Sequence, residues 1–162
     1  LVKSQCKNTI IWGGNYFCDY LPPSMGWLIW DKGQRSFSLA DGEMAWTSFS
    51  NALRIKEYSR ALANKENKHH ATQKPIELVV WAFEYADRHS KYKPKLILDF
   101  FGGSGSTLIA CEKTGRHCRM MELDEKYVDV IINRWQDFTG KESVHAETGK
   151  TFNEMKAERH GS

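Results

Sequence analysis

The sequence lacks several features that would each point to a particular class of protein. No apolar run approaches the roughly 20 residues that a membrane-spanning helix needs, and the first residues, LVKSQCKN, contain no signal-peptide core. No two of the four cysteines are spaced as C-x-x-C, which argues against a zinc site and favours free thiols in a reducing cytosol. The absence of internal repeats and low-complexity segments excludes repeat architectures.

What is present describes an ordinary folded domain with a local excess of positive charge. The 162 residues are 41% hydrophobic and 12% aromatic, enough for one domain with a real core. The formal net charge is +3, which permits a nucleic-acid partner without requiring one. Residues 54–74 hold six Lys/Arg and two acids, so the basic charge is concentrated in one stretch.

Hydrophobic periodicity and turn residues predict the order of helices and strands. We expect strands at 9–13, 27–31, 43–49, 54–58, 95–100 and 117–123, and helices at 15–21, 76–88, 107–114, 124–135 and 151–159. The strand–helix–strand–helix order after residue 95 is typical of a βαβ unit, which indicates an α/β fold with a parallel sheet.

A glycine-rich turn between an expected strand and an expected helix gives the strongest local signal. Asp99 ends the strand, and the turn runs through FFGGSGS to Thr107. Glycines there allow close approach of a ligand, but Leu108 replaces the third glycine of a dinucleotide loop, and the Asp99 carboxylate would repel a pyrophosphate. S-adenosylmethionine, which carries an ammonium and a sulfonium and no phosphate, suits this turn better. Glu122 ends the next strand, where a carboxylate can accept both ribose hydroxyls of any adenosine cofactor. The alternative is a purely structural turn.

Three motifs resemble those of the amino-group DNA methyltransferases of the permuted (beta) type, which act on adenine N6 or cytosine N4. His70–Pro75 (HATQKP) resembles the family's H-x-T-Q-K-P, Asp99–Thr107 its glycine loop, and Glu122–Tyr127 its E-x-x-x-x-Y, in the family's order and spacing. Upstream, WGGNYF at 12–17, WDK at 30–32 and EMAWT at 43–47 resemble phage and prophage adenine methylases.

The resemblance implies a fold, a cofactor and a partner. The fold would be a Rossmann-like S-adenosylmethionine-dependent methyltransferase, a mostly parallel sheet with helices on both faces, and incomplete. It would occupy residues 1–138, followed by a polar tail at 139–162. The cofactor would be S-adenosylmethionine and the partner double-stranded DNA. By match to the motifs, the cofactor-binding residues are Thr72, Gln73, Lys74, Pro75, Asp99, Phe101, Gly103, Ser104, Gly105 and Glu122. No metal site is expected, because the adjacent His69 and His70 have no third ligand.

The family's catalytic tetrapeptide, (Asp/Asn/Ser)-Pro-Pro-(Tyr/Phe), is missing from the sequence. In Leu21-Pro22-Pro23-Ser24 the leucine cannot accept the target amine's hydrogen bonds and the serine cannot stack on an extruded base. In relatives the tetrapeptide lies upstream of the WGGNYF stretch, and here eleven residues precede Trp12, the first of them Leu1. We expect a fragment that is inactive alone. A homodimer, a separate chain supplying the tetrapeptide, and a non-catalytic binding protein are the alternatives.

The basic stretch before the cofactor motifs is a candidate DNA contact. Arg54, Lys56, Arg60, Lys65 and Lys68 could bind phosphates, and a solvated charged loop is an equally good interpretation. Trp12, Tyr16, Trp30 and Trp46 could stack on a base, but core packing is the better prediction for most of them. An RNA methyltransferase and, more remotely, an NAD-dependent oxidoreductase stay open as other functions.

Overall fold

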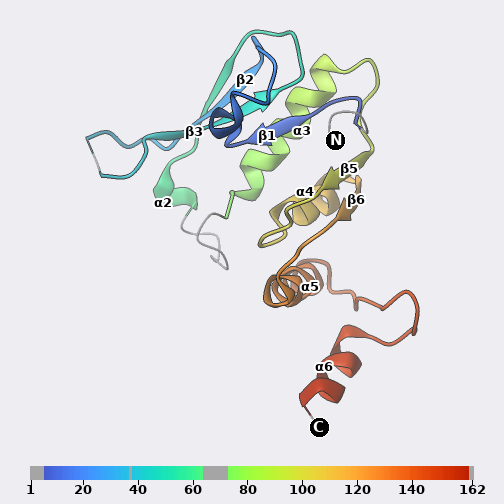
Figure 1. Cartoon of the computed structure of the whole chain (residues 1–162). Helices are drawn as coiled ribbons and strands as arrows, with labels where there is room; N and C mark the ends of the chain where they lie inside the picture. Colours follow the sequence, from blue (N-terminus) through green and yellow to red (C-terminus); the bar gives the residue numbers. More distant parts are fainter. Residues whose placement is uncertain (1–5, 37, 64–72, 161–162) are drawn as a thin grey trace. The chain divides into compact units, whose positions relative to one another are not determined.

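The computed structural model of the chain describes residues 6–36, 38–63 and 73–160 (Figure 1). The chain divides into two compact units, which we describe separately. Unit 1 comprises residues 1–68 and 74–94, and unit 2 comprises residues 69–73 and 95–162. The predicted residues Lys65, Lys68, His70 and Thr72 lie outside the described residues.

Unit 1 is built on a four-stranded sheet in the order β1-β3-β2-β4 (Figure 1). The strands are β1 (Ile10–Trp12), β2 (Trp27–Asp31), β3 (Gly42–Thr47) and β4 (Arg54–Glu57). β2 and β4 are parallel, whereas β3 runs antiparallel to both β1 and β2. The prediction of a mostly parallel sheet therefore does not extend to β3, because the short β2–β3 connection has no crossover helix, which only parallel neighbours require.

One helix, α3 (Ile76–His89), packs on this sheet, and the side chains between the helix and the sheet form the core of unit 1. Leu28 and Trp30 alternate with less buried residues along β2, as expected for a strand with one face against a helix. The ring of Phe49 meets that of Tyr85 edge to face at 5.4 Å between centroids. Two short elements complete the unit, the 3-10 helix η1 (Gly14–Phe17) and α2 (Arg60–Ala63), of which only α2 was not predicted.

Unit 2 begins with the predicted βαβ arrangement. Strands β5 (Leu96–Asp99) and β6 (His117–Met120) are parallel neighbours joined by α4 (Ser106–Thr114). Two further helices follow, α5 (Glu125–Thr139) and α6 (Phe152–His160). Asp124 caps α5 as predicted, its side chain accepting a hydrogen bond from Lys126 N. β6 is three residues shorter than predicted, because the chain turns there toward the glycine loop, where Gly102 N donates to Met121 O.

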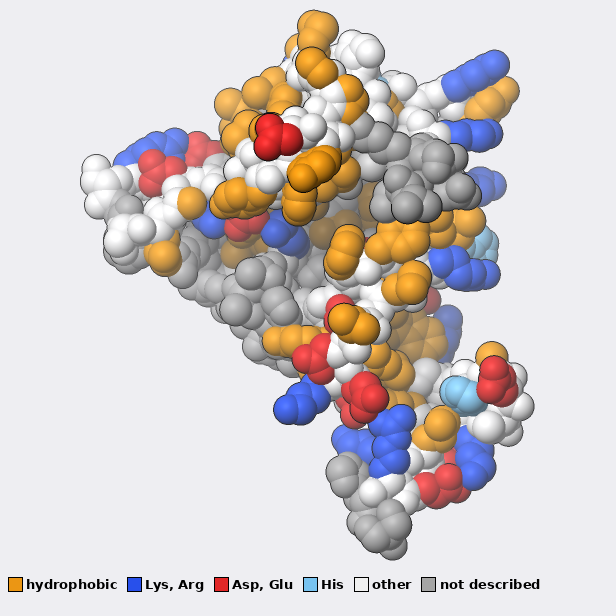
Figure 2. Space-filling view, viewed as in Figure 1, with side chains coloured by type: hydrophobic (Ala, Val, Ile, Leu, Met, Phe, Trp, Pro, Cys, Tyr) orange, Lys and Arg blue, Asp and Glu red, His pale blue; other side chains and the backbone are white. Residues whose placement is uncertain are grey.

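The tryptophans are distributed unevenly between the two units. Trp12, Trp27, Trp30, Trp46 and Trp81 belong to unit 1, and Trp135 on α5 belongs to unit 2. Trp30 and Trp46 are buried and donate Nε1–H to backbone carbonyls, which confirms core packing for both. Tyr16, in contrast, is 83% exposed, and apolar side chains lie on much of the visible surface (orange in Figure 2).

Within the described part of the chain, no helix is both long and apolar enough to span a bilayer.

Candidate functional site

The glycine loop joins the end of β5 to the start of α4, and the amides of residues 101, 102, 103 and 105 donate hydrogen bonds within the chain. Phe101 N donates to the Asp99 carboxylate at 3.0 Å, and Gly105 N donates to Gly102 O at 2.8 Å. Gly102 and Gly103 donate to the segment that follows β6. A loop that cradles a phosphate instead directs its amides at the ligand, so this arrangement suits a ligand without phosphate.

Glu122 ties the glycine loop to the end of β6. One carboxylate oxygen accepts from Gly103 N at 2.6 Å, and the other accepts from Leu123 N and Asp124 N at 2.9 and 3.0 Å. These bonds occupy three of roughly four acceptor positions of a carboxylate. A contact with both ribose hydroxyls would have to displace at least one of them. That Glu122 binds the ribose stays a prediction. The structure shows in addition that Glu122 holds the glycine loop through Gly103 N, which the sequence did not indicate.

Two glycines of the loop adopt backbone conformations that other residues avoid, and their surroundings differ. Gly103 has φ +54°, and a Cβ atom built on it would meet only Phe101 O, at 3.9 Å. Gly105 has φ +81°, and its Cβ would lie 3.2 Å from Ile131 side-chain atoms. Gly105 therefore packs against α5, while Gly103 leaves open space beside the loop for an incoming ligand.

Helix α5 holds the far side of the loop. Arg134 Nη1 donates a hydrogen bond to Ser104 O, and the Ser104 side chain is buried. One residue further along α5, Trp135 Nε1 donates to the Glu112 carboxylate on α4 at 2.9 Å. Sequence analysis missed Arg134, because thirty residues separate it from its partner and no local pattern marks the contact.

Two acidic and two exposed apolar side chains lie at the carboxyl ends of β5 and β6 in unit 2. β5 and β6 are parallel with Asp99 opposite Met120, so Asp99 and the Glu122 that follows β6 emerge at the same edge of the sheet. Phe101 is 87% exposed and Leu123 is 98% exposed on the segments that carry these acids. Carboxylates beside exposed apolar groups suit a ligand that combines a cation with an aromatic or sugar moiety. Leu123 was not among the predicted residues.

The described residues of the HATQKP motif fall in both units. Gln73 is half-buried and belongs to unit 2, whereas Lys74 and Pro75 belong to unit 1. Pro75 is fully buried, and its carbonyl accepts hydrogen bonds from Leu78 N and Val79 N in the first turn of α3. The Lys74 ammonium pairs with Glu43 at 2.8 Å, a contact within unit 1 that sequence analysis did not predict.

Of the five predicted DNA contacts, the structure describes two side chains. Arg54 on β4 is exposed, and its guanidinium donates to Leu53 O. Lys56 is half-buried, with its ammonium 6.0 Å from the centroid of Trp81. The side chains of Arg60, Lys65 and Lys68 lie outside the described set. Among the described residues, no three His, Cys, Asp or Glu side chains gather in a way that could hold a metal ion.

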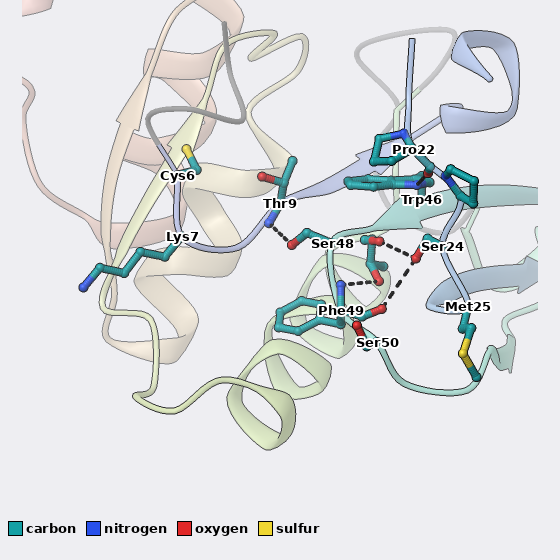
Figure 3. A pocket seen from close by; sticks show the side chains of 12 residues that line it. Cys6, Lys7, Thr9, Pro22, Ser24, Met25, Trp46, Ser48, Phe49 and Ser50 are labelled. Carbon is teal, nitrogen blue, oxygen red and sulfur yellow. Dashed lines mark hydrogen bonds between the residues drawn. The ribbon is translucent and has the colours of Figure 1, made fainter. Parts of the chain in front are cut away.

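Unit 1 also contains a cavity of about 380 Å³, whose lining includes Trp46, one of the predicted base-stacking residues (Figure 3). It is lined by the residues before β1, by the Pro22–Met25 turn and by the end of β3. Its polar groups bond to one another: Ser24 Oγ donates to Thr47 O at 2.7 Å, and Thr9 N donates to Ser48 Oγ at 2.9 Å (Figure 3). None of the predicted cofactor-binding residues lines this cavity.

Three kinds of comparison with known proteins give matches, including these four. The N6/N4 family model described as DNA methylase matches residues 9–134. The type II methyltransferase M.HindIII of Haemophilus influenzae is 26% identical over 85 residues, which is 52% of this chain and 25% of that protein, so the chain spans a quarter of this relative's length. The crystal structure of the M1.HpyAVI–SAM complex superposes with a TM-score of 0.54 at 22% identity, over 78% of this chain and 73% of that chain. A second M1.HpyAVI crystal structure superposes with a TM-score of 0.53 at 16% identity, over 79% and 74%. The chain therefore shares the fold of M1.HpyAVI.

Proposed function

Because the chain belongs to the N6/N4 DNA methylase family, we propose that it carries the S-adenosylmethionine-binding part of an amino-group DNA methyltransferase, with adenine N6 as the target. The domain would comprise residues 1–138, with 139–162 as a tail. The family match over residues 9–134 supports these bounds. The upstream resemblance to adenine methylases supports the choice of base.

The observation that carries this proposal is the glycine loop and its two acids. The loop amides from 101 to 103 and that of Gly105 donate within the chain, and both acids emerge at one edge of the β5–β6 pair. The open space beside Gly103 accommodates a ligand against the backbone. These features fit a nucleoside that carries cations better than one that carries a pyrophosphate.

The predicted residues would bind different parts of the cofactor. S-adenosylmethionine supplies an electrophilic methyl group on its sulfonium. Asp99 would accept hydrogen bonds from the ammonium, Glu122 would accept from the ribose, and Phe101 would cover the loop. Gly103, Ser104 and Gly105 would line the same pocket. Thr72, Gln73, Lys74 and Pro75 would surround the methionine end.

Methyl transfer also needs a group that binds the target amine. The exocyclic amine of adenine is a poor nucleophile, because its lone pair is delocalised into the ring. The sequence contains no D-P-P-Y-type tetrapeptide. We therefore propose that residues outside this sequence supply it, on the same polypeptide or on a second chain, and that residues 1–162 alone do not methylate DNA.

DNA binding is assigned to the basic stretch. Arg54, Lys56, Arg60, Lys65 and Lys68 would contact phosphates of double-stranded DNA. The exposed Arg54 on β4 supports this assignment. A DNA-methylating enzyme of this kind would work in the cytoplasm of a bacterial cell, encoded by the bacterium or a phage.

Calorimetric titration tests the cofactor assignment. We expect S-adenosylhomocysteine to bind the chain and NADH not to bind. Asp99→Asn, which removes the charge that faces the ammonium, should weaken S-adenosylhomocysteine binding by about tenfold or more. Transfer of a labelled methyl group to DNA by residues 1–162 alone would contradict the assigned lack of activity. NADH binding at the loop would contradict the cofactor assignment itself.

A further inference from the structure

Glu43 on β3 lies between two lysines that come from different parts of unit 1. Its two carboxylate oxygens contact Lys32 Nζ at 3.0 Å and Lys74 Nζ at 2.8 Å. Lys32 directly follows β2, whereas Lys74 directly precedes Pro75 and α3. One carboxylate thus joins the two central strands of the sheet, β3 and β2, to the residue that leads into the helix.

The two salt bridges of Glu43 are partly shielded from solvent, which strengthens the attraction between their charges. The side chains of Lys32, Glu43 and Lys74 are 14%, 33% and 23% exposed, so these pairs are better protected from solvent than a surface salt bridge. Burial acts to raise the pKa of the Glu43 carboxyl, but the hydrogen bonds and charges of Lys74 and Lys32 together hold that pKa below its ordinary value. The carboxylate is therefore ionised and paired at neutral pH.

Aromatic rings fix the two ammonium groups from a second direction. Lys74 Nζ lies 5.8 Å from the centroid of Trp12, and Lys32 Nζ lies 4.9 Å from that of Trp30. Lys74 is therefore held by a carboxylate and by an indole at once. Such double restraint leaves its side chain few alternative conformations.

Lys74 is also the residue at which the chain passes from the short segment 69–73 of unit 2 into unit 1. The next residue, Pro75, is fully buried and accepts the first hydrogen bonds of α3. Any restraint on Lys74 therefore acts on the start of α3.

We propose that Glu43 is a positioning residue that holds Lys74, and through it the start of α3, in the conformation that the cofactor-binding motif requires. In its effect on cofactor binding this inference rests on the proposed function. It gives Glu43, in the EMAWT segment, a role that the proposed function does not assign.

A double-mutant cycle tests the inference in the full chain, with S-adenosylhomocysteine as the titrant. The variants are Glu43→Gln, Lys74→Met and their combination, and each is checked by near-UV circular dichroism. We expect either single change to raise the Kd about tenfold and the combination to raise it no further, because both remove the same restraint. Glu43→Asp, which withdraws the carboxylate by one methylene, replaces Glu43→Gln if the latter does not fold.

Lys32→Met is the matched control, because Lys32 contacts the same carboxylate at a similar distance but does not lead into the motif. It should leave the Kd within about threefold of the unchanged chain. Additive effects of the Glu43 and Lys74 changes, or an equal loss in the Lys32 variant, would overturn the inference.

Hydrogen exchange separates failure of this inference from failure of the proposed function. If the unchanged chain does not bind S-adenosylhomocysteine, the cofactor assignment is wrong, but the positioning role of Glu43 is not yet tested. The restraint is then measured at the Leu78 and Val79 amides, which donate to Pro75 O. Glu43→Gln and Lys74→Met should each speed their exchange about tenfold and Lys32→Met should not. Equal exchange in all variants would overturn the positioning role.

Discussion

Replacing Gly103 by alanine separates the backbone requirement of the glycine loop from its contact with a ligand. Gly103 has φ +54°, and an added Cβ would meet only Phe101 O, at 3.9 Å. Gly115, at the end of α4, has φ +64° and no atom within 4 Å of an added Cβ. Both alanine variants should therefore lose about 1–2 kcal/mol of unfolding free energy from the left-handed conformation alone.

The two variants should differ in ligand binding. If the cofactor packs against the loop at van der Waals distance, the new methyl group at residue 103 occupies part of its volume. A steric cost of about 1–3 kcal/mol corresponds to a rise of about 5- to 150-fold in the Kd for S-adenosylhomocysteine. Gly115→Ala should leave this Kd within about twofold, because residue 115 ends α4 at the opposite end from the loop.

Urea unfolding followed by far-UV circular dichroism gives the stability of both variants, and calorimetry gives the Kd. We expect the two variants to lose equal stability and only Gly103→Ala to bind S-adenosylhomocysteine more weakly. Two outcomes would refute the reasoning: a Kd for Gly103→Ala within twofold of the unchanged chain, or the same weakening in Gly115→Ala.

Three further changes test other contacts of the two units. Gly105→Ala should lose about 1–3 kcal/mol more stability than Gly103→Ala in the same urea assay, because its Cβ would lie 3.2 Å from Ile131. Glu122→Gln should lower the unfolding free energy by about 1–3 kcal/mol, since an amide cannot accept all three backbone N–H groups, and an unchanged urea midpoint would contradict the tie to Gly103. The depressed pKa of Glu43 predicts that its contribution is complete above the unfolded value near 4.5 and is lost as pH falls through the lower folded value. Urea midpoints from pH 6 to 3 should therefore fall less in Glu43→Gln than in the unchanged chain.

Most helices and strands could be predicted from the sequence because their signals are local. The apolar spacing of 76–88 defined α3, and the glycine turn located the junction of β5 and α4. Predicted bounds were wrong where a distant contact decides them. β6 ends at Met120, because the residues after it bond to the glycine loop. The orientation of β3 also depends on its partners and has no signature of its own.

The sequence predicted which residues belong to the candidate site but not most of the contacts that they make. Asp99, Glu122 and the glycines lie together in unit 2, since parallel neighbouring strands bring their carboxyl ends to one edge. The contacts of Lys74 with Glu43 and of Arg134 with Ser104 join residues about thirty positions apart. No periodicity or motif encodes such pairs, and only the folded arrangement reveals them.

The uneven distribution of indoles makes the two units spectroscopically unequal. Five of the six tryptophans lie in unit 1, so intrinsic fluorescence follows mainly that unit. Trp135, held to Glu112, is the single tryptophan in unit 2. A melting curve recorded by emission alone would therefore report an early opening of the glycine-loop unit only weakly. A selective probe of that unit is a chain in which the other five indoles are replaced by phenylalanine.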